Sequence, residues 1–241
     1  MALVVEAKGV VKAYGGVRAL DDLDLALGGG RIDAIIGPNG AGKTTLFNVL
    51  TGFARPDEGH IFVDGRAIDA LSPQRRVRVG LVRSFQILEV FPALTVGDVL
   101  TTAALLHEAL REAKRQARAL CAELELPWSL TSSDLTPGEV RRLELGRCMA
   151  ARPRMLLLDE VMAGLTVPEA EFMMERIRAL QRRGIEIVVV EHVMDVIKRL
   201  CEHVHVFAAG RIIASGTFDR VAADTAVIEA YLGTRGRHDV A

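Results

Sequence analysis

GPNGAGKTT, residues 37–45, has the most specific pattern in this chain. It satisfies G-x-x-x-x-G-K-[ST], the pattern of a phosphate-binding loop in which glycines let backbone N–H groups converge on a polyphosphate. In such a loop the lysine neutralises phosphate charge and the threonine binds Mg²⁺. We therefore expect a nucleoside triphosphate to contact the whole loop, namely Gly37, Pro38, Asn39, Gly40, Ala41, Gly42, Lys43, Thr44 and Thr45.

The sequence on either side of the loop supports this interpretation. Residues 31–36 form a short, mostly apolar segment, as in a buried strand, and residues 45–50 have the pattern of a helix start. The N-terminus of that helix would direct the positive end of its dipole toward the phosphates. This predicted order of strand, loop and helix separates a phosphate-binding loop from an ordinary glycine-rich turn.

Composition limits the class of protein. The 241 residues allow one large domain or two small ones, and the net charge of −1 gives no reason to expect a nucleic acid partner. Three widely spaced cysteines predict no disulfide framework and fit a reducing compartment. The N-terminus lacks the pattern of a signal peptide, and no run of about 18 apolar residues exists. Membrane association would therefore require a partner protein.

The segments around the loop have less specific patterns. Residues 1–30 are typical of strands and turns, and Tyr14 beside Gly15 is either a turn residue or an aromatic that stacks on a purine. Residues 59–65 alternate and end in Asp-Gly, which predicts a hairpin. The local arginines predict a solvated basic face, made of Arg75, Arg76, Arg78 and Arg83.

From about residue 95 the pattern becomes helical. One apolar stripe recurs at intervals of three and four up to the helix-stopping Pro127, and it consists of Leu106, Leu110, Ala113, Ala117, Leu120 and Leu124. A second helix begins at Thr136, because Thr136 and Glu139 form a capping box and Pro137 takes the favoured first position. The amides of this helix start would either face an anion or belong to a plain surface helix.

Two predicted buried strands end in polar residues. Residues 155–158 lead to Asp159 and Glu160, and residues 185–190 lead to Glu191 and His192. Ligands of α/β sheets bind beyond the carboxyl ends of parallel strands. Asp159 would hold Mg²⁺ through water, Glu160 would orient a hydrolytic water, and His192 would contact the γ-phosphate.

Taken in order, these motifs resemble those of ATP-binding cassette (ABC) ATPases over essentially the whole chain. The resemblance implies an α/β fold with a RecA-like P-loop core, an antiparallel β subdomain and an inserted helical subdomain at about residues 88–152, all within one domain of residues 1–241. It also implies ATP and Mg²⁺ as cofactors and a dimer in which each loop faces the partner's signature helix.

The resemblance implies a role for each matching residue. Tyr14 would stack on adenine, and Gln86 would sense both Mg²⁺ and the membrane partner. The catalytic residues would be Glu160, His192 and Gln86, and the metal would be held by Thr44, Gln86 and Asp159. The signature residues, which serve the partner's nucleotide, would be Thr136, Pro137, Gly138 and Glu139.

A narrower resemblance is to the ATPases of branched-chain amino acid importers. It is carried by residues 83–86 (RSFQ), 94–96 (LTV), 141–144 (RRLE), 191–194 (EHVM) and 230–233 (AYLG). It implies transport of branched-chain amino acids or related small amides. It also implies two transmembrane permease subunits, a second ATPase subunit, identical or different, and an indirectly contacting substrate-binding protein. The chain would lie peripherally on the cytoplasmic face of the inner membrane.

Two alternatives remain open at this stage. One is an ATPase of the lipopolysaccharide-export type, and the other is a nucleotide-gated structural subunit with little turnover. The second is favoured by departures from the family pattern. Residues 135–139 read LTPGE in place of LSGGQ, Val161 replaces a proline, and Thr166 replaces an acidic or amide residue. The carboxylate of Glu139 would repel the partner's γ-phosphate unless it folds back to cap its own helix.

Overall fold

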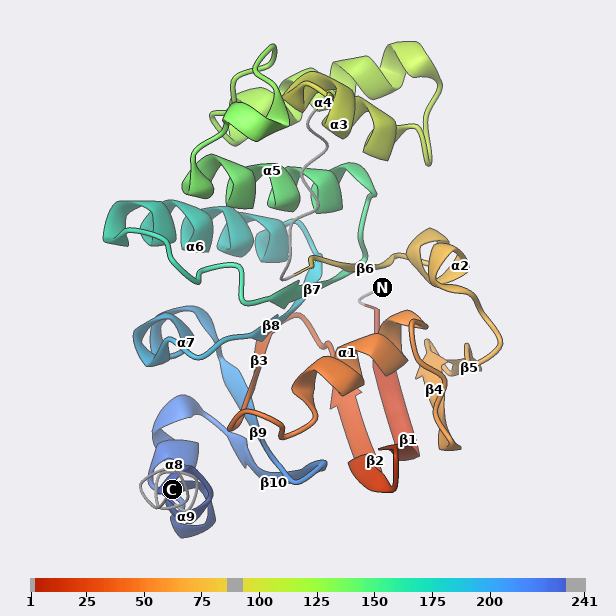
Figure 1. Cartoon of the computed structure of the whole chain (residues 1–241), viewed down its shortest axis with the longest axis vertical. Helices are drawn as coiled ribbons and strands as arrows, with labels where there is room; N and C mark the ends of the chain where they lie inside the picture. The colour runs from red at the N-terminus through yellow and green to blue at the C-terminus, as the bar shows by residue number, and fades with distance from the viewer. Residues whose placement is uncertain (1–2, 86–92, 233–241) are drawn as a thin grey trace.

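A six-stranded sheet forms the centre of the computed structural model, which describes residues 3–85 and 93–232 (Figure 1). Its strand order is β10-β9-β3-β8-β7-β6; the five strands from β9 to β6 are parallel and β10 is antiparallel. The strands span Ile32–Ile36 (β3), Leu81–Arg83 (β6), Met155–Asp159 (β7), Glu186–Val190 (β8), His203–Ala208 (β9) and Arg211–Gly216 (β10).

Both faces of this sheet are covered, which explains the unbroken apolar runs of its central strands. Neighbouring residues of one strand point into two different cores: Leu156 and Leu158 pack on one side, and Leu157 packs on the other. All five residues of β3, β7 and β8 are buried. The predicted strands before and after the phosphate-binding loop are therefore confirmed.

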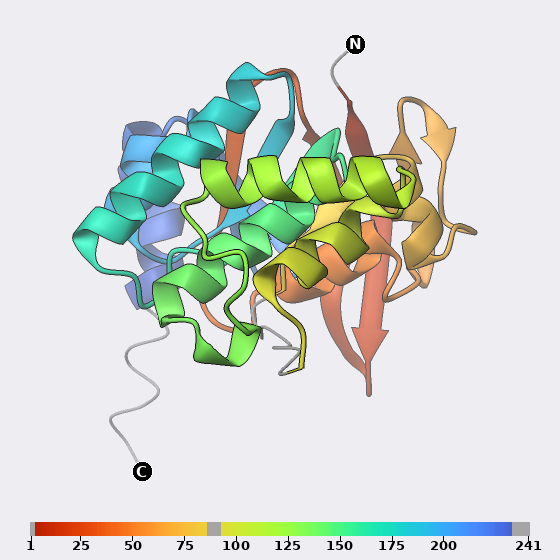
Figure 2. The same cartoon turned by 90° about the horizontal axis from the view of Figure 1, so that it is seen from above.

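Helices cover the first face. They are α5 (Pro137–Ala150), α6 (Val167–Arg182) and α7 (Met194–Leu200), with α3 (Val96–Ala104) and α4 (Leu110–Glu123) packed on α5. Figure 1 shows α5 between the α3–α4 pair and the sheet side of the molecule, and Figure 2 looks down on this helical layer.

The predicted apolar stripe is correct only for its last four residues. Ala113, Ala117, Leu120 and Leu124 are buried, whereas Leu106 and Leu110 are exposed. The chain leaves α3 at residue 104 and starts α4 only at residue 110, so the helical period is interrupted between them. The periodic spacing continued across this turn by coincidence, because Leu106 lies between the two helices and Leu110 is the first residue of α4.

The second face carries α1 (Lys43–Thr51) and a four-stranded antiparallel sheet of order β2-β1-β4-β5. These strands are β1 (Val5–Tyr14), β2 (Val17–Leu27), β4 (Glu58–Val63) and β5 (Arg66–Ala67). The predicted hairpin is confirmed, since β4 and β5 pair around Asp64 and Gly65, both of which have positive φ. That geometry is typical of an Asp-Gly hairpin turn.

The predicted basic face is wrong for two of its four arginines. Arg76, on α2 (Pro73–Arg78), is 1% exposed and donates hydrogen bonds to the carbonyl oxygens of Val49 and Leu50 at 2.6 and 2.7 Å. It thus caps the C-terminal end of α1, where a positive charge is favourable. Arg83 is also buried, in the site described below. Charge patterning alone does not distinguish such arginines from surface ones.

The last described elements are two short helices, α8 (Phe218–Ala222) and α9 (Thr225–Leu232), beside β9 and β10. A 3₁₀ turn, Ser132–Asp134, precedes α5. Across the described residues, none of the helices is both long and apolar enough to traverse a bilayer.

Candidate functional site

Three groups of predicted site residues gather along one edge of the six-stranded sheet. Strand β8 lies between β3 and β7, with Val190 paired to Ile35 on one side and to Asp159 on the other. Since the three strands are parallel, their carboxyl ends meet at this edge. The phosphate-binding loop, the Asp159–Glu160 pair and His192 each follow one of these ends, where α/β sheets bind ligands.

The loop requires glycine where it touches its neighbours. Gly42 has a φ of 107°, a conformation that side chains disfavour, and a Cβ there would collide with the carbonyl oxygen of Ala19 on β2. A Cβ at Gly37 would likewise collide with the carbonyl oxygen of Phe207 on β9. The loop is therefore held between the antiparallel and central sheets, which keeps its amides in place for an anion.

Lys43 folds back over the loop that carries it. Its Nζ donates to the carbonyl oxygens of Gly37 and Pro38 at 2.6 and 3.0 Å. Burial lowers the pKa of this amine, and the negative charges of Glu160 and Asp159 act in the opposite direction. The ammonium group is thus poised at the centre of the loop, partly withdrawn from water.

The start of α1 is open toward this centre. Within the described loop and helix, the N-cap Gly42 makes no side-chain capping hydrogen bond and the first turn carries no acidic residue. The first amides of a helix have no partner inside the helix and bind anions readily. The arrangement fits a phosphate group.

Glu160 and His192 lie close enough to act on the same molecule. The Nδ1 atom of His192 lies 3.8 Å from Oε1 of Glu160, and the amide of Glu160 donates to the carbonyl of Val190 at 2.9 Å. Glu191, which is buried, accepts the amide hydrogen of Met162 at 2.9 Å. The turn after β7 is therefore fastened to the end of β8, which fixes the backbone of Glu160 relative to that of His192.

Asp159 is paired with a residue that the sequence had placed on the surface. Its Oδ2 lies 2.6 Å from Nη2 of Arg83, and its amide donates to Oγ of Ser84 at 2.9 Å. The other terminal nitrogen of Arg83 donates to Oδ1 of Asn48 at 2.6 Å. Arg83 begins the RSFQ segment, residues 83–86, that carries part of the family resemblance, and it is the counter-charge of Asp159.

The oxygen donors at this edge suit Mg²⁺. A carboxylate, Asp159, and a hydroxyl, Thr44 in the first turn of α1, are hard oxygen ligands of the kind that magnesium takes alongside phosphate oxygens. Magnesium is usually held by one or two protein groups together with phosphates and waters. The residues present therefore fit that metal.

Glu139 does fold back on its own helix. Its Oε2 accepts hydrogen bonds from the amide and the hydroxyl of Thr136, both at 2.8 Å, and its own amide donates to the Thr136 hydroxyl. The Thr136 amide, followed by the hydroxyl, lowers the pKa of Glu139. The predicted capping box and helix start are confirmed. Gly138 beside it lies against the carboxylate of Glu169, which would have to move if a Cβ were added there.

Tyr14 and Gln86 are the two remaining predicted residues. Tyr14 is half exposed at the end of β1, with Nζ of Lys12 at 5.3 Å from its ring centroid. Its hairpin continues into β2, which packs against the phosphate-binding loop at Ala19. Gln86 lies outside the described residues.

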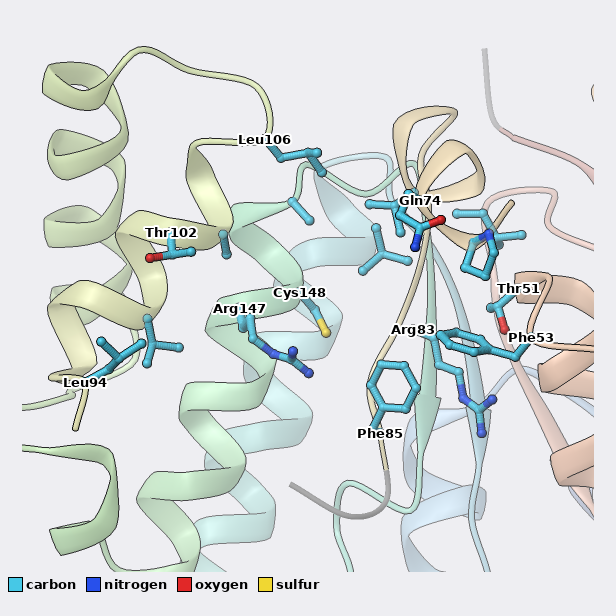
Figure 3. A pocket seen from close by; sticks show the side chains of 17 residues that line it. Thr51, Phe53, Gln74, Arg83, Phe85, Leu94, Thr102, Leu106, Arg147 and Cys148 are labelled. Carbon is cyan, nitrogen blue, oxygen red and sulfur yellow. The ribbon is translucent and has the colours of Figure 1, made fainter. Parts of the chain in front are cut away.

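A groove of about 480 Å³ opens next to the site (Figure 3). Its wall is mostly apolar and comes from both halves of the molecule: Phe53 after α1 and Phe85 after β6 on one side, Leu106 and the helix α5 on the other. The amide of Phe85 donates to Oε1 of Glu144 on α5 at 3.0 Å, which joins the two walls. Sequence patterns gave no signal for this groove.

Comparison with known proteins identifies the arrangement. A family described as "ABC transporter" matches residues 20–163. The chain belongs to the ABC transporter family. It is 34% identical to the high-affinity branched-chain amino acid transport ATP-binding protein BraF of Pseudomonas aeruginosa, over 95% of this chain and 98% of the relative. It is 32% identical to the corresponding protein LivG of Escherichia coli, again over 95% and 98%.

Solved structures agree with this assignment. The chain superimposes on the ADP conformation of an ATP-binding cassette of an ABC transporter with a TM-score of 0.86 at 27% identity, covering 97% of this chain and 100% of the other. The predicted α/β P-loop fold and the resemblance to branched-chain amino acid importer ATPases are confirmed. The chain is therefore the ATPase subunit of an ABC transporter, which binds a nucleotide and hydrolyses ATP for transport.

Proposed function

We propose that this ABC ATPase drives the uptake of branched-chain amino acids or related small amides. The observation that carries the substrate class is the C-terminal segment: residues 211–236 match a family described as "Branched-chain amino acid ATP-binding cassette transporter". The described part of this segment comprises β10, α8 and α9, and Tyr231 of α9 lines a pocket together with Ile36, the residue before the phosphate-binding loop. It also favours import over the lipopolysaccharide-export alternative, since the match is to an amino acid transporter group.

In the proposed mechanism, ATP lies on the phosphate-binding loop with Tyr14 on its adenine. Lys43 and the open start of α1 bind the phosphates, and Mg²⁺ is held by Thr44, Asp159 and Gln86. The bound magnesium supplies charge that stabilises the phosphates. Glu160 orients the attacking water, and His192, 3.8 Å from Glu160, contacts the γ-phosphate.

The proposed partners occupy two different surfaces. The groove beside Phe85 receives an apolar helix of a membrane subunit, because its wall is apolar and connects to Asp159 through Arg83. Two permease subunits would bind two ATPase chains in this way on the cytoplasmic face of the inner membrane. A substrate-binding protein acts indirectly, and no nucleic acid takes part.

The start of α5 is the second surface. In the proposed dimer, Thr136, Pro137, Gly138 and Glu139 face the nucleotide of the partner ATPase subunit, whether that subunit is identical or different. We assign the whole chain, residues 1–241, to one nucleotide-binding domain with a helical subdomain at about residues 88–152. In this arrangement each nucleotide site is completed by a second chain.

Reconstitution tests the proposal. The chain would be assembled with its membrane subunits in vesicles containing an excess of binding protein, and ATP-dependent uptake of radiolabelled leucine would be compared with that of urea and a polar amino acid. Glu160→Gln should lower ATP hydrolysis about 100-fold or more, as expected for loss of the group that orients water. Glu175→Gln, at an exposed carboxylate of α6, is the control. ATP-dependent uptake of the polar amino acid without uptake of leucine or urea would contradict the proposed substrate class.

A further inference from the structure

Arg83 stands between the nucleotide edge and the groove. Its side chain is 6% exposed, yet it lines the groove wall as well as pairing with Asp159. Its guanidinium carbon lies 5.3 Å from the ring centroid of Phe47 and 5.5 Å from that of Phe85. Among the described residues, its Nε is a buried donor without a hydrogen-bond partner. The group is thus bonded chiefly through its two ends, Asp159 and Asn48.

The ion pair between Arg83 and Asp159 neutralises a buried charge. Asp159 is 3% exposed, and a buried carboxylate is costly unless a positive charge is close. Arg83 supplies that charge at 2.6 Å. A divalent metal brought to the same carboxylate would add a second cation within a few ångströms, where like charges repel strongly in a partly buried site. The two cations therefore compete for Asp159.

Phe85 connects this competition to the groove. Arg83 and Arg147 both lie over its ring, at 5.5 and 5.9 Å, and Phe53 meets it edge-on at 5.5 Å. Figure 3 shows Arg147 and Phe53 approaching Phe85 from opposite walls. A helix seated in the groove would contact these same rings. Any shift of Phe85 would alter the packing that holds the Arg83 guanidinium on Asp159.

We propose that Arg83 is a positioning residue that neutralises Asp159 until the metal–nucleotide complex binds. We also propose that occupation of the groove, acting through Phe85, changes how tightly Arg83 pairs with Asp159. This inference rests on the proposed function, because it assumes Mg²⁺ on Asp159 and a membrane-subunit helix in the groove. It assigns the communication between the two surfaces to one buried side chain.

Nucleotide affinity measured with and without metal tests the first half. Fluorescent N-methylanthraniloyl-ATP would be titrated into the purified full chain in Mg²⁺ and in EDTA. The Kd ratio is the Kd in EDTA divided by the Kd in Mg²⁺, so it rises when the metal favours nucleotide binding more strongly. Arg83→Gln removes the competing cation, so the ratio should rise about fivefold or more over the wild-type ratio. Arg83→Lys, which keeps the charge, should return the ratio to near the wild-type value.

Arg76→Gln is the matched control. Arg76 is a second buried arginine, but its hydrogen bonds go to backbone carbonyls, those of Val49 and Leu50 at the end of α1 and that of Leu71. This variant should lower the melting temperature and leave the Kd ratio unchanged. If Arg83→Gln, like Arg76→Gln, lowers the melting temperature and leaves the Kd ratio unchanged, Arg83 has a structural role and the inference is wrong. If Arg83→Gln reduces the Kd ratio, Arg83 orients the metal site and the inference is also wrong.

Phe85→Ala tests the second half, and this single variant does not depend on Arg83→Gln folding, since Phe85 is only half-buried. It should raise the Kd ratio about twofold and add nothing in the Arg83→Gln background. Leu106→Ala, elsewhere in the same groove, should have no effect. An unchanged ratio for Phe85→Ala, or an additive double variant, would refute the connection. Wild-type protein that binds the nucleotide no better with Mg²⁺ than with EDTA would overturn the proposed function as well.

Discussion

Helix α1 starts at a bare glycine, whereas helix α5 starts with a capping box. Gly42 adds no side-chain oxygen to the amides of α1, and within the described first turn no carboxylate faces them. At α5 the carboxylate of Glu139 accepts both the amide and the hydroxyl hydrogen of Thr136. One helix end is left open for an external anion, and the other is occupied by its own chain.

The neighbours of the two helix ends sharpen this contrast. Gly42 packs against the neutral carbonyl of Ala19, while Gly138 packs against the carboxylate of Glu169. The Glu169 carboxylate is itself bound by the amide and hydroxyl of Thr166 at 2.8 and 2.7 Å. Two carboxylates therefore lie at the start of α5, both engaged by threonines. The start of α1 is therefore suited to bind an anion, whereas in the proposed dimer the start of α5 would attract a partner's phosphate less strongly.

The largest effect is expected at the open end. Lys43→Ala removes the ammonium group from the centre of the loop, where it now bonds the carbonyls of Gly37 and Pro38. A hydrogen bond to a charged group contributes about 1.5–3 kcal/mol, so ATP affinity should fall roughly 10- to 100-fold. Fluorescent-ATP titration measures it, with Lys114→Ala on the exposed face of α4 as control. An affinity loss below threefold would show that the open helix end alone binds the phosphates.

A smaller effect is expected when the charge is removed from the capped end. Glu139→Gln keeps an oxygen acceptor for Thr136 but removes the negative charge that would face the partner's nucleotide. Two unit charges about 4 Å apart interact by about 1 kcal/mol in water. We therefore expect ATP turnover of the assembled transporter to rise about three- to fivefold. Unchanged turnover would mean that the capping hydrogen bonds already neutralise this carboxylate.

Much of this contrast was predictable, because it depends on residues close together in the chain. The loop pattern of residues 37–45 and the Thr136–Glu139 spacing are local, and local hydrogen bonding is set by spacing alone. The buried strands were predictable for a related reason. A strand covered on both faces must be apolar along its whole length, as residues 155–158 are.

The remaining features depend on pairs far apart in the sequence. Arg83 and Asp159 are separated by 76 positions, so nothing in the local pattern distinguishes Arg83 from an exposed arginine. Arg76 was misplaced for the same reason, since its partners are carbonyls of another helix. The groove arises where α1, α3, α5 and β6 meet. Tertiary packing overrides charge patterning at such positions.

A modest stability effect is expected from removing the cap itself. Thr136→Ala deletes the hydroxyl that accepts the Glu139 amide hydrogen, which should cost about 1 kcal/mol of unfolding free energy. Thr95→Ala is the matched control, because Thr95 and Asp98 form the same box at the start of α3. Urea denaturation should show similar losses for both variants. Only Thr136→Ala should change ATP turnover in the assembled transporter. If Thr95→Ala changes turnover as well, the effect comes from loss of stability in the helical layer as a whole.

The smallest effect concerns pH. The hydrogen bonds from Thr136 lower the pKa of Glu139 in the folded protein below its unfolded value of about 4.3. Since the folded state holds the carboxylate in its charged form, this stabilisation is fully present above the unfolded pKa and is lost as pH falls through the folded pKa. Wild type should therefore exceed Glu139→Gln in stability at pH 7, and the difference should shrink as the pH is lowered below about 4.

Asp98→Asn provides the comparison for this pH effect, because the Thr95 hydroxyl and amide lower the pKa of Asp98 in the same way. Denaturation midpoints at pH 7, 5 and 3.5 would give both difference curves. If the Glu139 curve stays flat while the Asp98 curve falls, the Glu139 carboxylate is not held in its capping position in solution. It would then be free to face the partner's phosphate, and the capped end of α5 would be more repulsive than its hydrogen bonds imply.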